Sequence, residues 1–320
     1  MTFVRTVLGD VPPGELGPCY AHEHIIIEQG YTTEQYPDFL LNSVEHAADE
    51  LAECYAAGVR AMVDSMPAGC SRSATKLAEV SSRSGVHIVC PTGLHLRKYY
   101  PPDHPLLGLD EDALTELFVA DIRDGVDAND YEGPEIRRTP HRAGVIKVAG
   151  GLNSLNAHEQ KAFRAAAAAH RITGAPILTH TEQGTAALEQ VKLLSDAGVE
   201  ARHVVLSHTD RNPDLAYHRE ILSTGVFVEF DSAFRWKPGQ GNPTRDLVVA
   251  LFAEGLGDQV MLGMDAARRG YWRMYGGAPG LTFLVTEFRS QLLEAGLSPG
   301  DFDRIMVKNP SRAFAFRAGD

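Results

Sequence analysis

The sequence predicts an α/β protein that folds as a single-domain (β/α)8 TIM barrel over residues 1–320, and three observations lead to this fold. Short runs rich in β-branched residues alternate with segments of helical periodicity from about residue 20 to the end of the chain. The 320 residues are 44% hydrophobic, which is enough for one large core. Residues that can bind metals stand where several of the apolar runs end.

Eight strands are expected, at residues 19–27, 59–66, 86–92, 144–149, 175–180, 203–208, 226–231 and 259–264. Helices are expected at residues 43–57, 71–84, 110–124, 156–174, 184–197, 213–224, 244–255, 281–295 and 301–315. The helix that begins at Asn156 has the clearest signals, because Glu159 completes a capping box and Gly174 marks the end. This alternation without a linker favours a barrel over a doubly wound sheet. The longest connection, residues 93–143, is expected to carry a lid or a pocket wall.

Potential metal ligands stand at the ends of five predicted strands: His22, His24, Lys147, His180, His208 and Asp265. His22 and His24 are two residues apart in an extended segment, so both imidazoles would project to one side. The alternative for this pair is a satisfied polar end of a sheet. In barrels of this kind the chemistry lies at the C-terminal ends of the strands, where His22, His24, His180, His208 and Asp265 fall. His87 and His203 fall at strand starts and are interpreted as surface or packing residues.

Lys147 is unusual because it stands inside an apolar strand. A lysine there loses hydration, its charged form becomes costly, and a neutral amine is a good nucleophile. The alternative is an ammonium group that reaches the barrel mouth and pairs with a carboxylate.

The chain resembles the phosphotriesterase family of the amidohydrolase superfamily along nearly its whole length. The residues that carry the resemblance are Gly-Pro-Cys-Tyr-Ala-His-Glu-His at 17–24, Lys147, His180 in Thr-His-Thr, His208 in Ser-His-Thr-Asp, Gly-Met-Asp at 263–265 and Asn-Pro-Ser-Arg-Ala-Phe at 309–314. The order of these motifs on strands 1, 4, 5, 6 and 8 is highly specific.

The resemblance implies that carbon dioxide carboxylates Lys147 and that the carbamate bridges two divalent metal ions. His22, His24 and Asp265 would hold one ion, and His180 and His208 the other. Zinc suits these ligands best, with manganese or cobalt as alternatives. A metal-bridging hydroxide would attack the substrate near neutral pH, and Asp265 would be the catalytic residue that moves the proton.

Two positions depart from the organophosphate-hydrolysing members of this family. Those members carry a histidine directly after the aspartate that ends strand 7, whereas Ser232 follows Asp231 here. Arg211 stands where they carry an acidic residue, although Asp210 remains. Efficient phosphotriester hydrolysis is therefore not expected.

Basic residues are concentrated in the loops after strands 3, 7 and 8. Segments 93–100, 232–245 and 266–280 contain Arg97, Lys98, Arg235, Lys237, Arg245, Arg268, Arg269 and Arg273, and no Asp or Glu. In a chain of net charge −12 this pattern indicates a small anionic substrate, with arginine and lysine suited to phosphate or carboxylate. About half of these bases, most plausibly Arg97, Arg245 and Arg273, are expected to pair with nearby acids or to face water.

Met-Asp-Ala-Ala-Arg-Arg-Gly-Tyr-Trp at 264–272 is similar to the family branch that hydrolyses lactones of phosphorylated sugars. By that resemblance the phosphate-binding residues would be Lys237, Arg268, Arg269 and either Tyr99 or Tyr100. Trp236, Tyr271 and Trp272 are candidates for the pocket wall or for simple packing. We therefore expect a binuclear metal-dependent hydrolase that opens a sugar lactone phosphate.

Two other functions stay open at this point: a phosphotriester or phosphodiester hydrolase that uses the same site, and a non-catalytic binding protein that keeps the barrel. The negative charge argues against nucleic acid or membrane partners. We expect a cytoplasmic protein, because the first residues do not resemble a signal peptide. A homodimer is expected by analogy with relatives only.

Overall fold

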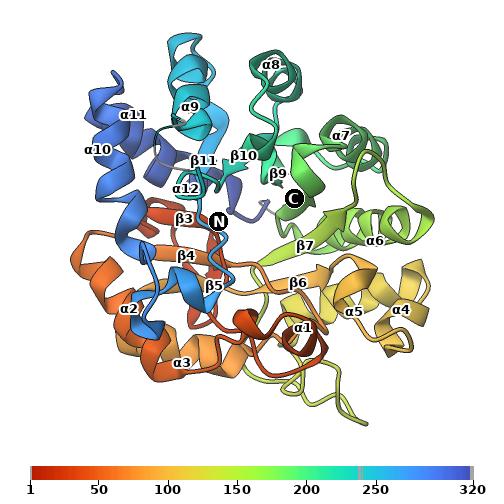
Figure 1. Ribbon diagram of the computed structural model, residues 1–320. Helices are drawn as coiled ribbons and strands as arrows, with labels where there is room; N and C mark the ends of the chain where they lie inside the picture. Colours follow the sequence, from red (N-terminus) through yellow and green to blue (C-terminus); the bar gives the residue numbers. More distant parts are fainter. Residues whose placement is uncertain (1, 237–238, 240, 318–320) are drawn as a thin grey trace.

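A closed ring of parallel strands surrounded by helices forms the molecule (Figure 1). The computed structural model describes residues 2–236, 239 and 241–317. The barrel strands are β3 (Cys19–Glu23), β4 (Ala61–Asp64), β5 (His87–Val89), β6 (Pro91–Leu94), β7 (Val145–Gly150), β8 (Ile177–Thr181), β9 (Val204–Ser207), β10 (Phe227–Phe230) and β11 (Val260–Leu262). The predicted (β/α)8 TIM barrel is confirmed.

The third barrel strand is interrupted in its middle, which explains why nine labels describe eight positions. Before Cys90 the strand pairs through β5 with β4, and after it through β6 with β7. The barrel closes between the first and last strands, where the amides of Met264 and Asp265 each donate to the carbonyl of His22 at 3.2 Å. The sequence analysis ended this third strand at residue 92, two residues too early.

Helices cover the outside of the ring (Figure 1). They are α1 (Tyr31–Gln35), α2 (Val44–Ala56), α3 (Ala74–Ser84), α4 (Pro105–Gly108), α5 (Glu111–Arg123), α6 (Ala157–Thr173), α7 (Ala187–Asp196), α8 (Leu215–Ser223), α9 (Pro243–Ala253), α10 (Glu287–Glu294), α11 (Pro299–Asp303) and α12 (Asn309–Ala313). The capping box of Asn156 and Glu159 at the start of α6 is confirmed, and Gly174 ends that helix with φ 75°.

A short hairpin lies at the N-terminal end of the barrel and was not predicted. Its strands are β1 (Val4–Thr6) and β2 (Gly9–Val11), and the amide of Val7 donates to the carbonyl of Ile88 in β5. Phe3 stacks on Phe316 with 4.6 Å between ring centroids. Since this end of the barrel is filled with apolar side chains, the polar residues of the interior gather at the opposite end.

The long connection at residues 93–143 contributes little to the pocket. Only its first part, through His95 and Tyr99, lines the cavity at the barrel mouth. Much of the rest packs around a buried ion cluster of Arg72, Asp121 and Asp130. The expectation of a pocket wall therefore applies to the start of this connection.

Among the described residues, no helix combines the length and apolar character needed to cross a bilayer. The cytoplasmic location, the single domain over residues 1–320 and the homodimer stay predictions.

Candidate metal centre

The six predicted ligands meet in one pocket at the C-terminal mouth of the barrel. His22, His24, Lys147, His180, His208 and Asp265 all line it. They come from β3, β7, β8, β9 and β11 or from the residues directly after these strands. His208 and Asp265 have left-handed φ values of 66° and 48°, conformations that non-glycine residues rarely adopt and that cluster at functional sites.

Three of the predicted ligands face one another on one side of the pocket. Nε2 of His24 lies 3.0 Å from Oδ1 of Asp265, and Nε2 of His22 lies 3.6 Å from the same oxygen. One donor atom from each of these residues falls within 4.8 Å of the others. Nδ1 of His24 has no hydrogen-bond partner among the described residues. This group has the composition and the spacing that a divalent cation needs.

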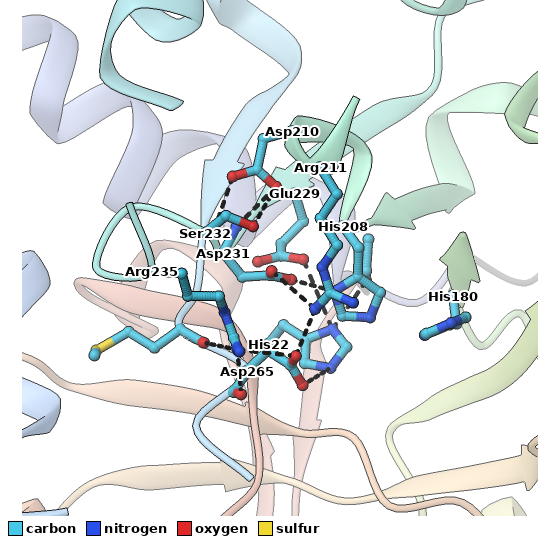
Figure 2. A network of polar contacts seen from close by, with 12 residues as sticks. His22, His180, His208, Asp210, Arg211, Glu229, Asp231, Ser232, Arg235 and Asp265 are labelled. Carbon is cyan, nitrogen blue, oxygen red and sulfur yellow. Dashed lines mark hydrogen bonds and ion pairs between the residues drawn. The ribbon is translucent and has the colours of Figure 1, made fainter. Parts of the chain in front are cut away.

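Carboxylates orient two further histidines. Nε2 of His180 lies 3.0 Å from Oε2 of Glu182. Nδ1 of His208 contacts Oδ2 of Asp231 most closely and also lies 3.0 Å from Nη2 of Arg211 (Figure 2). Because an ionised carboxylate only accepts hydrogen bonds, the contacting nitrogen carries the proton and the other nitrogen keeps its lone pair. His180 and His208 therefore have the tautomers of metal ligands.

Lys147 lies in β7 and lines the same pocket as these histidines. Its side chain is buried, and Nζ lies 3.4 Å from Nδ1 of His22. Burial lowers the pKa of Lys147 to about 7, although the negative charge of Glu229 acts to raise it. Near neutral pH a large fraction of the amine is unprotonated, which is the form that reacts with an electrophile such as carbon dioxide.

Burial also favours the neutral forms of His22 and His208. It lowers the pKa of His22 well below its usual value, with a further contribution from the charge of Lys147. Burial and the charge of Arg211 do the same for His208. Neutral imidazoles are the form that binds metals, so the donors present fit a cluster of divalent cations.

Glu229 in β10 was missed by the sequence analysis. Neither of its oxygens has a hydrogen-bond partner among the described residues, and Oε2 lies 3.7 Å from Nδ1 of His22. Burial raises its pKa well above the usual value, and the charge of Asp231 adds to this effect. A Cβ at Gly263 would lie 2.6 Å from Oε1, so the glycine leaves room for the carboxyl group. The sequence signal that could have identified Glu229 is an acidic residue two positions before Asp231 in an otherwise apolar strand.

Two arginines hold the second oxygen of Asp265. Nη2 of Arg211 lies 2.6 Å from Oδ2, and Nη2 of Arg235 lies 3.0 Å from it (Figure 2). Burial acts to raise the pKa of Asp265, but the hydrogen bond with His24 and the surrounding positive charges place it well below its usual value. The carboxylate is thus ionised and fixed in orientation, with Oδ1 toward the histidines.

Some of the predicted substrate-binding residues line the pocket and others do not. Tyr99 and Arg268 line the pocket. Tyr100 does not, because it is buried and its hydroxyl donates to the carbonyl of Ala68. Arg269 also lies outside the pocket lining, since its Nε donates to the carbonyl of Leu40 at 2.6 Å. Lys237 lies outside the described residues.

Other loop residues have assignable roles. Arg245 pairs with Asp246 and Arg273 with Glu53, and Arg97 is exposed, as predicted for these three. Lys98 pairs with Glu182 at 3.2 Å. Tyr271 lines the pocket, whereas Trp272 is buried and Trp236 donates to Thr244.

Comparison with known proteins agrees with this geometry. A profile of the phosphotriesterase family matches residues 2–314. The phospho-furanose lactonase of Mycoplasmopsis synoviae is 33% identical over 324 residues, which cover 98% of this chain and 92% of that protein. The crystal structure of an amidohydrolase from Mycoplasma synoviae has a TM-score of 0.94 at 31% identity and covers 100% of this chain and 93% of its own. A lactonase from Listeria monocytogenes gives a TM-score of 0.89 at 30% identity, over 99% and 100% of the two chains.

Proposed function

The chain belongs to the phosphotriesterase family, and from this membership we propose that it is a metal-dependent hydrolase that opens a small anionic lactone, with a sugar lactone phosphate as the preferred substrate class. One observation carries the proposal: six metal-binding donors line a single pocket together with Tyr99 and Arg268. The lactonases among its relatives favour an ester of this kind as the bond that is broken.

The family implies two divalent metal ions, and the donors of this chain fit them. His22, His24 and Asp265 would hold one ion, His180 and His208 the other, and Lys147, carboxylated by carbon dioxide, would contact both. Zinc is the proposed metal, with manganese or cobalt as alternatives. When bound, such ions polarise a carbonyl group and lower the pKa of water.

Asp265 is the proposed proton carrier. It accepts the proton that the attacking water loses, and it returns that proton to the ring oxygen when the bond between carbonyl carbon and ring oxygen breaks. The product is an open-chain hydroxy acid. Arg211 and Arg235 support this role because they hold one oxygen of Asp265 and prevent rotation of the carboxylate.

Arg268 is the proposed contact for the anionic group of the substrate. Its only ion pair among the described residues is with Asp38 at 3.7 Å, and its side chain is 44% exposed. Arg211 and Arg235, by contrast, are already committed to Asp265. Tyr99 adds a hydroxyl group to the same pocket. Among the other predicted residues, Lys237 stays a candidate, and Tyr99 is favoured over Tyr100 by its position. Arg269 is disfavoured because its guanidinium already donates to the carbonyl of Leu40.

The test is turnover by purified enzyme loaded with zinc or manganese in bicarbonate buffer. The panel contains phosphorylated aldonolactones, the same lactones without phosphate, and chromogenic phosphotriesters and phosphodiesters. We expect ring opening to be fastest for a phosphorylated lactone. Much faster turnover of a phosphate ester would favour phosphoester hydrolysis instead.

Metal analysis separates these enzymes from a binding protein. About two metal ions per chain are expected after growth with added metal. A chain that takes up no metal under these conditions, and that opens no lactone, would be a barrel without turnover.

A further inference from the structure

We propose that His95 is a substrate-contacting hydrogen-bond donor, not a metal ligand, and that its Nε2–H faces an oxygen of the lactone group. His95 follows β6 at the barrel mouth and lines the same pocket as the predicted ligands. Its ring centroid lies 5.3 Å from that of His180. The proposal rests on the proposed function and adds a residue to it.

A backbone hydrogen bond determines which nitrogen of this imidazole carries the proton. The amide of Leu96 donates to Nδ1 of His95 at 2.7 Å, so Nδ1 keeps its lone pair. A neutral imidazole carries one proton, which must then be on Nε2. A proton on Nδ1 would point at the amide hydrogen of Leu96, so the contact also disfavours the doubly protonated ring.

The tautomer of His95 is opposite to that of a histidine oriented by a carboxylate, because the nitrogen that faces away from the pocket lacks the proton in His95 and carries it in the other case. In His180, Nε2 faces an acceptor, Oε2 of Glu182, which leaves the lone pair of Nδ1 for a cation. In His95, by contrast, Nδ1 faces a donor, the amide of Leu96. The nitrogen left for the pocket therefore carries a hydrogen, and it can donate to an oxygen but cannot bind a cation.

The surroundings of His95 favour an uncharged acceptor. Tyr99 packs edge-on against the ring at 4.3 Å between centroids and restricts its rotation. The positive charge of Lys98 is paired with Glu182 and is not available to the pocket at this point. An anionic phosphate is better placed near Arg268, which leaves the carbonyl or ring oxygen of the lactone for His95.

The test compares His95→Phe, which removes the donor and keeps a ring, with His95→Gln, whose amide nitrogen can take the place of Nε2. Loss of one donor that faces developing negative charge lowers rates by ~10²-fold or more. We expect kcat/KM of His95→Phe to fall by about that factor, and equally for phosphorylated and unphosphorylated lactones. His95→Gln is expected to recover most of the loss. Both variants should bind as much metal as the wild type and should unfold at a similar temperature.

The assignment would be overturned by metal loss in His95→Phe, by wild-type turnover in His95→Phe, or by equal loss in both variants. A fall restricted to phosphorylated lactones would move the contact to the phosphate and also overturn it. If the wild type opens no lactone, the proposed function fails by itself. Metal content of the two variants then still decides whether His95 is a ligand.

Discussion

Nη2 of Arg211 lies 2.6 Å from Oδ2 of Asp265 and 3.2 Å from Oδ1 of Asp231, so one guanidinium joins the acids that follow two neighbouring strands. The organophosphate-hydrolysing members of the family have an acidic residue at the position of Arg211. Here a third acid would add repulsion, whereas the arginine neutralises two carboxylates and fixes both.

Arg211→Ala should therefore lower kcat by ~10²-fold, because small displacements of a catalytic group can cost about that much. The measurement is steady-state lactone hydrolysis by the metal-loaded enzyme. The matched control is Arg219→Ala, which removes an exposed guanidinium that pairs with Glu254. Equal kcat values for Arg211→Ala and the control would exclude a role for Arg211 in orienting Asp265.

Lys147→Ala should lose metal and activity together. The substitution removes the amine that would be carboxylated, and the two ions would lose their shared ligand. A short carboxylic acid such as propionate, added at high concentration with metal, is expected to restore part of the activity. Metal content is measured by elemental analysis, and an undiminished content would contradict the bridging role.

Arg268 and Arg269 provide a matched pair of neighbouring arginines. Arg268→Ala should raise KM for a phosphorylated lactone by about tenfold, since a charge-assisted contact contributes ~1.5–3 kcal/mol. The KM for the unphosphorylated lactone should change little. Arg269→Ala should affect mainly stability, by about 1 kcal/mol, because its guanidinium donates to the carbonyl of Leu40. Equal KM effects on both lactones in Arg268→Ala would remove the phosphate assignment.

The barrel and the strand-end positions of the candidate ligands could be predicted because both follow from local signals. His180 and His208 stand beside or within apolar runs, and the C-terminal ends of parallel strands meet at one end of a barrel. Partners from distant segments could not be predicted. Lys98 and Arg269 are both basic loop residues in the sequence. Only the folded chain shows that Lys98 pairs with Glu182 and that Arg269 donates to the carbonyl of Leu40.

Interruptions of regular structure caused the other errors. The third strand resumes after Cys90 and continues to Leu94, so His95 stands at a strand end although the sequence analysis placed it in a loop. The strand predicted for 19–27 ends at Glu23, and within it the register shifts against β4 between Tyr20 and Glu23. His22 and His24 therefore reach the pocket from an irregular segment and not from ideal alternation.

Arg72 should be a large contributor to stability. It is buried and lies 3.2 Å from Asp121 and 3.0 Å from Asp130. Arg72→Met leaves Asp130 without its cation and Asp121 with Arg138 alone, and it should lower the free energy of unfolding by ~3–5 kcal/mol in urea titrations. The control is Arg83→Met, which breaks an exposed pair with Glu79 and should cost under about 1 kcal/mol. Similar losses in the two variants would refute the importance of the buried cluster.

His203, which lies directly before β9 and at the opposite end of that strand from His208, should make the protein less stable in acid. Burial lowers its pKa to about 4, with smaller contributions from His170 and Arg202. The unfolded chain binds this proton near pH 6.5 and the folded chain only near pH 4. The free energy of unfolding thus falls as the pH decreases between these values.

In His203→Gln this acid-dependent loss should be smaller. The measurement is the difference between the urea unfolding free energies at pH 7.5 and pH 4.5, for the wild type and the variant. Identical differences in the two proteins would show that His203 does not titrate in this way.

The central claim is that Lys147 carries a carboxyl group between two metal ions, and a crystal structure of the protein grown with zinc and bicarbonate tests it most directly. We expect anomalous signals from two ions, one in contact with His22, His24 and Asp265 and the other with His180 and His208, and density for a carboxyl group on Nζ of Lys147. An unmodified Lys147 with no ion bound to these residues would contradict the account.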